Sequence, residues 1–216
     1  MSVGIFGGTF NPIHWGHLRA AEEVAEQLEL ERVLFVPSAS PPHKRDAGIA
    51  PAELRLAWVR DAIADNPRFT ADPLEIERGG RSYSVETLRE IGARLAPELP
   101  VFVIGCDAFA EIAEWREPDA LLRLAHFAVM TRPPADAGTL REWLPQSLAG
   151  AIEFAPDSRS GRHREAGTRL RLIEISALDV SSSDVRRRLR DGHSVRYLLP
   201  ETIRHDVEKS EVYAAA

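Results

Sequence analysis

The chain has 216 residues, enough to bury a hydrophobic core without disulfides or structural metals. Its 33 acidic residues outnumber its 27 basic ones and give a net charge of −6, which excludes a global basic field that would recruit nucleic acid. A single cysteine excludes an internal disulfide framework, and no apolar run reaches the roughly 20 residues of a membrane helix, so we expect a soluble, cytoplasmic protein.

The first half of the chain alternates short apolar runs with amphipathic ones. We expect strands at residues 3–6, 33–36, 74–77 and 101–104, and helices from residue 16, over 51–65 and over 84–95. In the helix over 51–65, the side chains expected to face inward are those of Leu54, Leu56, Ala57, Val59 and Ile63. Strands that alternate with helices favour an α/β fold with right-handed crossovers.

The second half is less regular. We expect helices at 109–112, 119–124, 182–190 and 200–208, and strands at 127–131 and 170–175. Residues 158–167 have the composition of a mobile surface loop. Without an internal repeat or a linker, the sequence predicts one domain over residues 1–216, with a C-terminal helical portion over 178–210. The predicted fold is a doubly wound, mostly parallel, Rossmann-like sheet with helices on both faces.

Four of the expected strand ends carry the unusual residues of the sequence. These segments are residues 7–17, 38–45, 105–107 and 181–186. In a doubly wound sheet the carboxyl ends of the strands share one edge, and ligands bind in the crevice there. The sequence therefore predicts one site built from all four segments.

The first of these segments reads as a strand, a glycine-rich turn and a helix start. Gly7 and Gly8 allow the backbone to approach a ligand closely, and the N–H groups of the turn and the first helical turn form an anion site, typically for phosphate. His14 and His17 stand where the helix opens. Their spacing also suits a metal, but no cysteine or carboxylate cluster nearby completes a ligand set.

The other segments add donors for an anion. The serine run that begins at Ser181 predicts a helix N-cap, and the same helix start can hold a phosphate with Arg186 beside it. Lys44, on a proline-stiffened loop, is a candidate phosphate contact. Trp115 either belongs to the core or stacks on a flat ring, while Arg187, Arg188 and Arg190 are expected to form a solvated face. Cys106 has no histidine or CxxC partner that would favour catalytic use.

Several common motifs are missing from the sequence. It contains no G-x-x-x-x-G-K-[ST], no G-x-G-x-x-G followed by an acidic residue, and no G-x-S-x-G. A phosphate site built from backbone, histidine, lysine and arginine without a nucleophile fits direct phosphoryl or nucleotidyl transfer.

The motifs GGTFNPIHWGH, SPPHK, RSYSVETL, VIGCDAF, EW, TRP, VSSSDVRRRL and SVRYLLP follow one another from about residue 4 to residue 208. In this order they resemble the bacterial nicotinate-nucleotide adenylyltransferases of the HxGH nucleotidylyltransferase superfamily. Val180 and Ser183 depart from the family's serine motif, which has Ile and Thr there. The resemblance implies transfer of AMP from ATP to nicotinate mononucleotide, which yields deamido-NAD and pyrophosphate.

The resemblance also implies a role for each matching residue. It assigns catalysis to His14, His17, Lys44 and Arg186, and ATP binding to Gly7, Gly8, Thr9, Phe10, Gly105, Asp107, Ser181 and Ser182. It assigns the nicotinate nucleotide to Ser84, Trp115 and Arg132. It also implies Mg²⁺ as a cofactor, bound mainly through the ATP phosphates, and no protein side chain is expected to ligate a metal.

Three alternatives stay open at this point. The first is an adenylyltransferase with a different acceptor, either nicotinamide mononucleotide or another phosphate ester such as phosphopantetheine. The second is a dinucleotide-binding oxidoreductase. The third is a nucleotide sensor without enzymatic activity. The sequence predicts small-molecule partners, and it gives no prediction of the oligomeric state.

Overall fold

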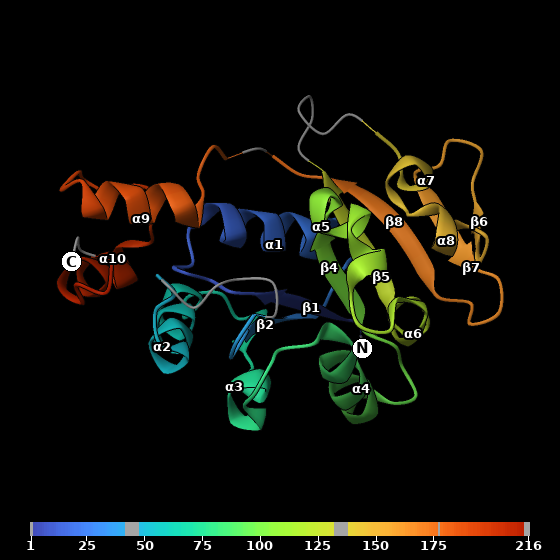
Figure 1. Ribbon diagram of the computed structural model, residues 1–216, viewed down its shortest axis with the longest axis horizontal. Helices are drawn as coiled ribbons and strands as arrows, with labels where there is room; N and C mark the ends of the chain where they lie inside the picture. Colours follow the sequence, from blue (N-terminus) through green and yellow to red (C-terminus); the bar gives the residue numbers. More distant parts are fainter. Residues whose placement is uncertain (1, 42–47, 132–137, 177, 214–216) are drawn as a thin grey trace. The chain divides into compact units, whose positions relative to one another are not determined.

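The computed structural model describes residues 2–41, 48–131, 138–176 and 178–213 (Figure 1). Its strands are β1 (Val3–Gly8), β2 (Arg32–Pro37), β3 (Phe69–Ala71), β4 (Val101–Gly105), β5 (His126–Thr131), β6 (Ile152–Phe154), β7 (Ser160–His163) and β8 (Arg169–Glu174). Its longer helices are α1 (Trp15–Gln27), α2 (Ala52–Ala62), α4 (Ser84–Leu95), α9 (Ser182–Arg190) and α10 (Glu201–Lys209). Its shorter ones are α3 (Leu74–Arg78), α5 (Cys106–Ala110), the 3₁₀ helix η1 (Ile112–Glu114), α6 (Pro118–Leu124), α7 (Leu140–Trp143) and α8 (Gln146–Ala149).

The described strands form one 8-stranded sheet in the order β3-β2-β1-β4-β5-β8-β7-β6. β4 pairs in parallel with β1 and β5, and β5 with β8, whereas β7 pairs antiparallel with β8 and β6. The predicted α/β fold with a mostly parallel, Rossmann-like sheet is therefore confirmed. The strand order reverses between β1 and β4, and folds of this kind bind ligands at such a reversal.

The chain divides into two compact units. The first comprises Met1–Gly7, Ala20–Val33 and Tyr83–Ala177, and the second comprises Gly8–Arg19, Leu34–Ser82 and Leu178–Ala216. The single domain over residues 1–216 stays a prediction. The C-terminal helices α9 and α10 belong to the second unit.

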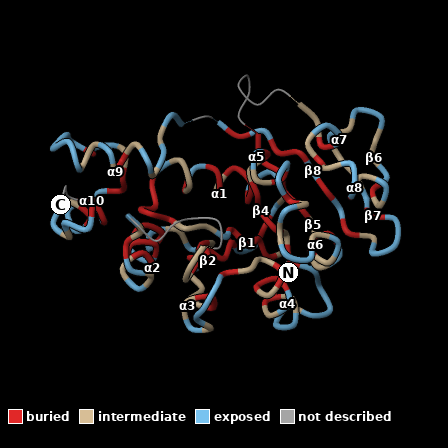
Figure 2. The backbone as a smooth tube through the Cα atoms, viewed as in Figure 1, coloured by how far each residue is buried: buried red, intermediate tan, exposed pale blue. Residues whose placement is uncertain are grey.

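The core of the first unit lies along β4 and β5. Phe102, Val103 and Ile104 of β4 are buried in succession, so both faces of this strand are covered, as its continuous apolar run predicted (Figure 2). The ring of Phe127 in β5 meets that of Phe102 edge to face, with centroids 5.6 Å apart. Within this unit the short helix α5 lies against β4 and β5 (Figure 1).

The core of the second unit contains the aromatic series Phe10, Phe35 and Phe69, whose successive ring centroids lie 5.8 Å and 5.0 Å apart. Helix α2 completes this core with a face that differs in part from the predicted one. Leu56, Val59 and Ile63 are buried as predicted, whereas Leu54 is only half-buried and Ala57 is exposed, and Arg55, Trp58 and Ala62 are buried in addition. Buried residues at positions 55, 58, 59 and 62 follow the helical repeat, so an arginine occupies a place where an apolar residue was expected.

Three other expectations are wrong. The strand predicted over 74–77 is the helix α3, because Pro73 precedes it and the Asp72 carboxylate accepts a hydrogen bond from Leu74 N (3.0 Å). The loop predicted over 158–167 contains β7, which is held by antiparallel pairing with β6 and β8. In addition, Gly7 and Gly8 do not break β1 but form its last two residues. None of the helices in the described residues is long and apolar enough to cross a membrane.

Candidate active site

The turn that follows β1 is held through its carbonyl groups. Four of them accept hydrogen bonds from three segments of the second unit: Gly8 from Ser38 N (2.9 Å), Thr9 from Arg55 Nη1 (2.6 Å), and, both from α9, Asn11 from Arg186 Nη1 (2.8 Å) and Pro12 from Ser182 Oγ (2.9 Å). Two of the donors are guanidinium groups, so positive charge lies behind the turn. These bonds occupy the carbonyl groups of the turn and leave its N–H groups as the candidates for binding an anion.

Phe10 gives the turn its shape. Its φ of +46° is unusual for a bulky residue and costs on the order of 1–3 kcal/mol, which the surroundings must compensate. The ring is buried and stands edge-on to His17, with centroids 5.2 Å apart. A Cβ on Gly8 would lie 3.0 Å from Phe10 Cζ, so Gly8 is the residue that accommodates this ring.

His14 and His17 form one unit at the start of α1. His14 O accepts the first helical hydrogen bonds, from His17 N (2.9 Å) and Leu18 N (3.3 Å), and His14 N donates to His17 Nδ1 (3.2 Å). The two imidazoles stack with centroids 3.7 Å apart and planes at 24°. Because His17 Nδ1 accepts this hydrogen bond, the proton of a neutral His17 ring lies on Nε2.

Gly16 makes this stack possible. A Cβ at this position would lie 3.1 Å from both Cε1 and Nδ1 of His14 and 3.0 Å from Val180 Cγ1. The buried His14 ring therefore lies directly on the backbone of the first turn of α1. Packing against His14 and Val180 in the second unit thus explains why the HxGH motif has a glycine at this position.

Helix α9 docks on the same turn. Ser181 is its N-cap, as predicted, and accepts from Asp184 N (3.1 Å). Arg186 is half-buried and donates to Asn11 O and, through Nη2, to Ser183 Oγ (3.2 Å). Burial lowers the pKa of Arg186, although a guanidinium stays charged near neutral pH.

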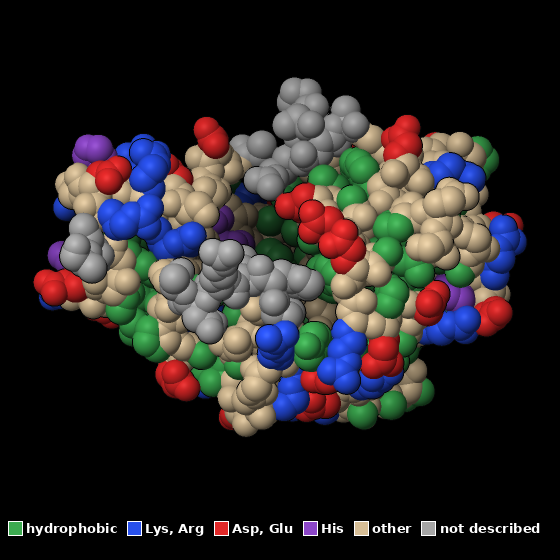
Figure 3. Space-filling view, viewed as in Figure 1, with side chains coloured by type: hydrophobic (Ala, Val, Ile, Leu, Met, Phe, Trp, Pro, Cys, Tyr) green, Lys and Arg blue, Asp and Glu red, His purple; other side chains and the backbone are tan. Residues whose placement is uncertain are grey.

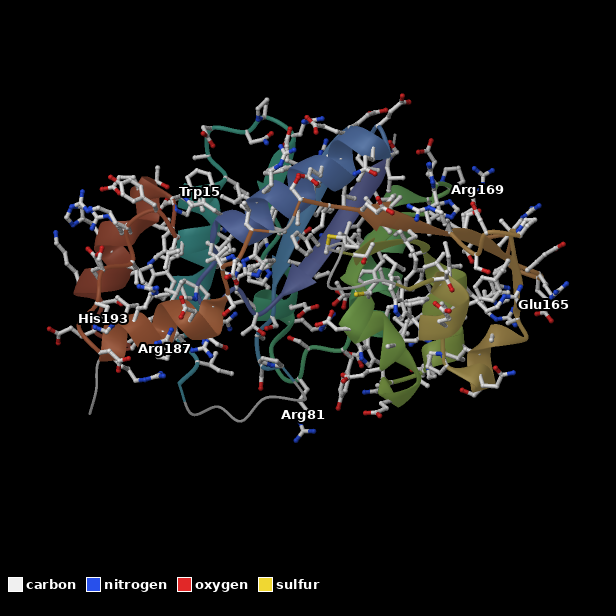
Figure 4. All side chains as sticks on the ribbon, turned by 90° about the horizontal axis from the view of Figure 1, so that it is seen from above. Trp15, Arg81, Glu165, Arg169, Arg187 and His193 are labelled. Carbon is white, nitrogen blue, oxygen red and sulfur yellow. The ribbon has the colours of Figure 1, made fainter. Side chains whose placement is uncertain are left out.

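The remaining arginines of α9 face outward. Arg187 and Arg188 both pair with Asp184, the latter at 2.9 Å. Lys and Arg side chains gather over α9 in the space-filling view (Figure 3), and Figure 4 shows Arg187 and His193 on the outside of this part of the chain. The predicted solvated face is therefore present.

Asn11 connects the turn to two further segments, and sequence reasoning treated it only as a turn signal. Its Oδ1 accepts from Ala50 N (2.9 Å) and from the Tyr213 hydroxyl, and its Nδ2 donates to Gly48 O (2.9 Å). Tyr213 is buried, 202 residues away in the sequence, and its ring lies 6.0 Å from that of Trp58. No local sequence pattern indicates so distant a partner.

The first unit carries the residues predicted for the adenosine and nicotinate groups. Gly105 ends β4, and a Cβ there would lie 2.5 Å from Asp107 Oδ1, so the glycine leaves room for this carboxylate. Trp115 is half-buried with its ring edge-on to Phe102, at a centroid distance of 6.4 Å. This is compatible with both interpretations of Trp115: its ring contacts the core at Phe102, and the part of the side chain that stays accessible could stack on a flat ring.

Ser84 is the first residue of α4, beside a group of charged side chains. Arg116 lies over the Tyr83 ring, with Cζ 4.7 Å from its centroid, and pairs with Glu86 at 3.2 Å. These contacts join the start of α4 to the segment that follows Trp115. Within the first unit, the neighbours of Ser84 and of Trp115 in the sequence are therefore in contact.

The second unit brings together Phe10, His14, His17 and the helix start from Ser181 to Arg186. Lys44 and Arg132, which were predicted to contact the phosphates and the acceptor, lie outside the described residues. Among the described residues, no group of three or more His, Cys, Asp or Glu side chains is arranged to hold a metal ion.

A profile of the cytidylyltransferase-like family matches residues 5–188. The chain belongs to the cytidylyltransferase-like family. This cytidylyltransferase-like chain is similar to a protein of Geotalea daltonii named "Probable nicotinate-nucleotide adenylyltransferase", at 44% identity over 213 residues that cover 99% of this chain and 98% of that protein. The resemblance indicated by the motifs is confirmed.

Solved structures share the fold of this cytidylyltransferase-like chain. Plasmodium falciparum nicotinic acid mononucleotide adenylyltransferase complexed with APC has a TM-score of 0.71 and 14% identity, covering 98% of this chain and 96% of that one. The same enzyme complexed with NaAD has a TM-score of 0.70 and 17% identity, covering 98% and 97%. At these identities the similarity establishes the fold alone.

Proposed function

We propose that this protein transfers AMP from ATP to nicotinate mononucleotide, forming deamido-NAD and pyrophosphate in NAD biosynthesis. The observation that carries the proposal is the segment from Gly8 to His17, which contains the stacked histidines and whose Asn11 carbonyl is held by the Arg186 guanidinium, all within one unit. The full-length relative with the corresponding name supports the reaction. We place the protein in the cytoplasm, with these small molecules as its partners.

The reaction joins two anions without a covalent enzyme intermediate. An oxygen of the acceptor's phosphate attacks the α-phosphorus of ATP and forms a new P–O bond. The bond between the α-phosphorus and the oxygen that bridges to the β-phosphorus breaks, and its electron pair leaves with pyrophosphate. Because the attacking oxygen is already anionic, no general base is required, and catalysis consists of alignment and charge stabilisation.

The described residues supply both. In the proposed site, His17 donates from Nε2 to an oxygen of the transferring phosphate, and the buried His14 ring fixes its plane by stacking. Arg186 holds positive charge beside the turn, and the start of α9 adds N–H groups. Gly105 and Asp107 are proposed for adenosine, and Ser84 and Trp115 for the nicotinate nucleotide. Lys44 and Arg132 are proposed to add charge from their loops.

The ATP substrate is proposed to be its Mg²⁺ complex. Nucleotidyl transfer from ATP generally uses a divalent metal, which neutralises charge on the triphosphate. Phosphate oxygens and water suit Mg²⁺ better than a dedicated protein cage does. We therefore propose that the ion is carried by the nucleotide rather than by side chains of this protein.

The proposal is tested by incubating the protein with ATP, Mg²⁺ and nicotinate mononucleotide and identifying the product by mass. His17→Ala should lower kcat by about a hundredfold, the scale of losing one transition-state donor. His193→Ala, an exposed histidine in the same unit, is the matched control and should keep wild-type kcat. Parallel reactions with nicotinamide mononucleotide and phosphopantetheine identify the acceptor. Wild-type turnover by folded His17→Ala would contradict the proposed role of the pair.

A further inference from the structure

Arg55 in α2 is a buried charged residue that the mechanism above leaves unused. Its exposed fraction is 0%, and arginine is almost never buried to this extent without partners. In the described residues the guanidinium donates to four backbone carbonyls, those of Ala50 (Nε, 2.9 Å), Thr9 (Nη1, 2.6 Å), Ser38 (Nη2, 2.6 Å) and Ala39 (Nη2, 3.3 Å).

Three of these four acceptors, on Thr9, Ser38 and Ala39, lie in segments from which the proposed site is built. Thr9 belongs to the turn after β1, and Ser38 and Ala39 begin the loop after β2. Ser38 N also donates to Gly8 O (2.9 Å), so the two segments are joined directly as well as through the arginine. The planar fork of one guanidinium therefore sets the spacing between two segments that we propose to bind phosphate.

The acceptors are carbonyl dipoles and not carboxylates, which bears on the charge of this group. Burial lowers the pKa of Arg55, while Tyr213, Glu53 and Glu75 act in the opposite direction. An arginine remains protonated under these conditions. The Arg55 guanidinium is thus stabilised by carbonyl dipoles, and among the described residues no hydrogen-bonded carboxylate neutralises its positive charge.

We infer that Arg55 is a positioning residue for adenylyl transfer: its guanidinium holds the turn at Thr9 and the loop at Ser38 and Ala39 in the spacing that the two anionic substrates require. The inference rests on the function proposed above. It predicts that the geometry of the fork matters, and not only the charge. A lysine retains the charge but is a point donor that cannot reach three segments at once.

The test compares Arg55→Lys with Val59→Ala, a core substitution on the same buried face of α2. Each variant is checked by circular dichroism and thermal melting and assayed with ATP and nicotinate mononucleotide below its melting temperature. Arg55→Lys should lower kcat at least tenfold, because misplacing reacting groups by about 1 Å costs about a hundredfold, while KM for ATP stays within about threefold. Val59→Ala should melt earlier but keep wild-type kcat.

Each other outcome counts against the inference. Wild-type kcat in Arg55→Lys, a rise in KM alone, or an equal loss of kcat in Val59→Ala would overturn it. If Arg55→Lys does not fold, Arg55→Gln is measured in the same way, and failure of both to fold would assign Arg55 to folding alone. A wild-type protein that makes no deamido-NAD would defeat the proposed function as well, which separates that failure from the failure of this inference.

Discussion

Substitution of Gly16 by alanine tests whether the stacked histidines are set by the backbone of α1. The new Cβ would lie 3.1 Å from Cε1 and Nδ1 of His14 and 3.0 Å from Val180 Cγ1, whereas ordinary contacts begin near 3.4 Å. The His14 ring must therefore shift by a few tenths of an ångström. It is buried and already stacked on His17 with centroids 3.7 Å apart, so the displacement passes to His17.

The magnitude follows from these distances. If a misplacement of about 1 Å costs about a hundredfold in rate, a shift of a few tenths of an ångström lowers kcat about fivefold to tenfold. The free energy of unfolding should fall by about 0–2 kcal/mol, because the loss of about 1–3 kcal/mol from overpacking is partly offset by up to about 1 kcal/mol from the higher helix propensity of alanine. Steady-state kinetics and urea unfolding of the same preparation measure the two effects.

Gly92→Ala is the matched control. Gly92 lies in α4, and a Cβ there would meet no atom within 4 Å. This variant should gain about 0.5–1 kcal/mol in unfolding free energy and keep wild-type kcat. Unchanged kcat in Gly16→Ala, or an equal loss in Gly92→Ala, would refute the reasoning that links this glycine to the histidine pair.

Two further predictions concern the residues that hold the turn. Arg186→Gln removes the hydrogen bond to Asn11 O and a charge beside the proposed phosphates, so kcat should fall at least tenfold, whereas Arg187→Gln on the outer face should change kcat less than twofold in the same assay. Tyr213→Phe removes the hydroxyl bound to Asn11 Oδ1 and should lower the free energy of unfolding by about 1 kcal/mol in urea titrations. Burial raises the pKa of Tyr213, so the unfolded chain ionises first, near pH 10; wild-type stability should fall as pH rises above about 10, and less so in Tyr213→Phe.

The sequence predicted elements whose signals are local. Helix α4 was expected at the bounds the structure has, and the apolar run of β4 indicated a strand covered on both faces. The N-cap at Ser181 followed from hydroxyl chemistry in the same way. Prediction failed where the hydrophobic pattern did not determine the structure. Strand β7 is stabilised by pairing with β6 and β8, and an alternating apolar run forms α3, at whose start the Asp72 carboxylate accepts a hydrogen bond from Leu74 N.

The candidate site shows the same division. Its histidines, glycines and serines stand in contiguous motifs, so the sequence indicated them and their chemistry. Asn11 and Arg55 were missed as contacts because their partners are backbone groups or a tyrosine far along the chain. A periodic helix pattern assigns inward positions to apolar residues, and it cannot recognise a buried charge whose acceptors come from other segments.

The central claim is direct attack of the acceptor's phosphate oxygen on the α-phosphorus of ATP. The most direct measurement uses nicotinate mononucleotide labelled with oxygen-18 in its phosphate, with mass analysis of both products and of the intact protein. The account predicts that all of the label appears in deamido-NAD, none in pyrophosphate, and that the protein gains no adenylyl group during turnover. Label in pyrophosphate, or a protein mass raised by one AMP that the acceptor then removes, would contradict it.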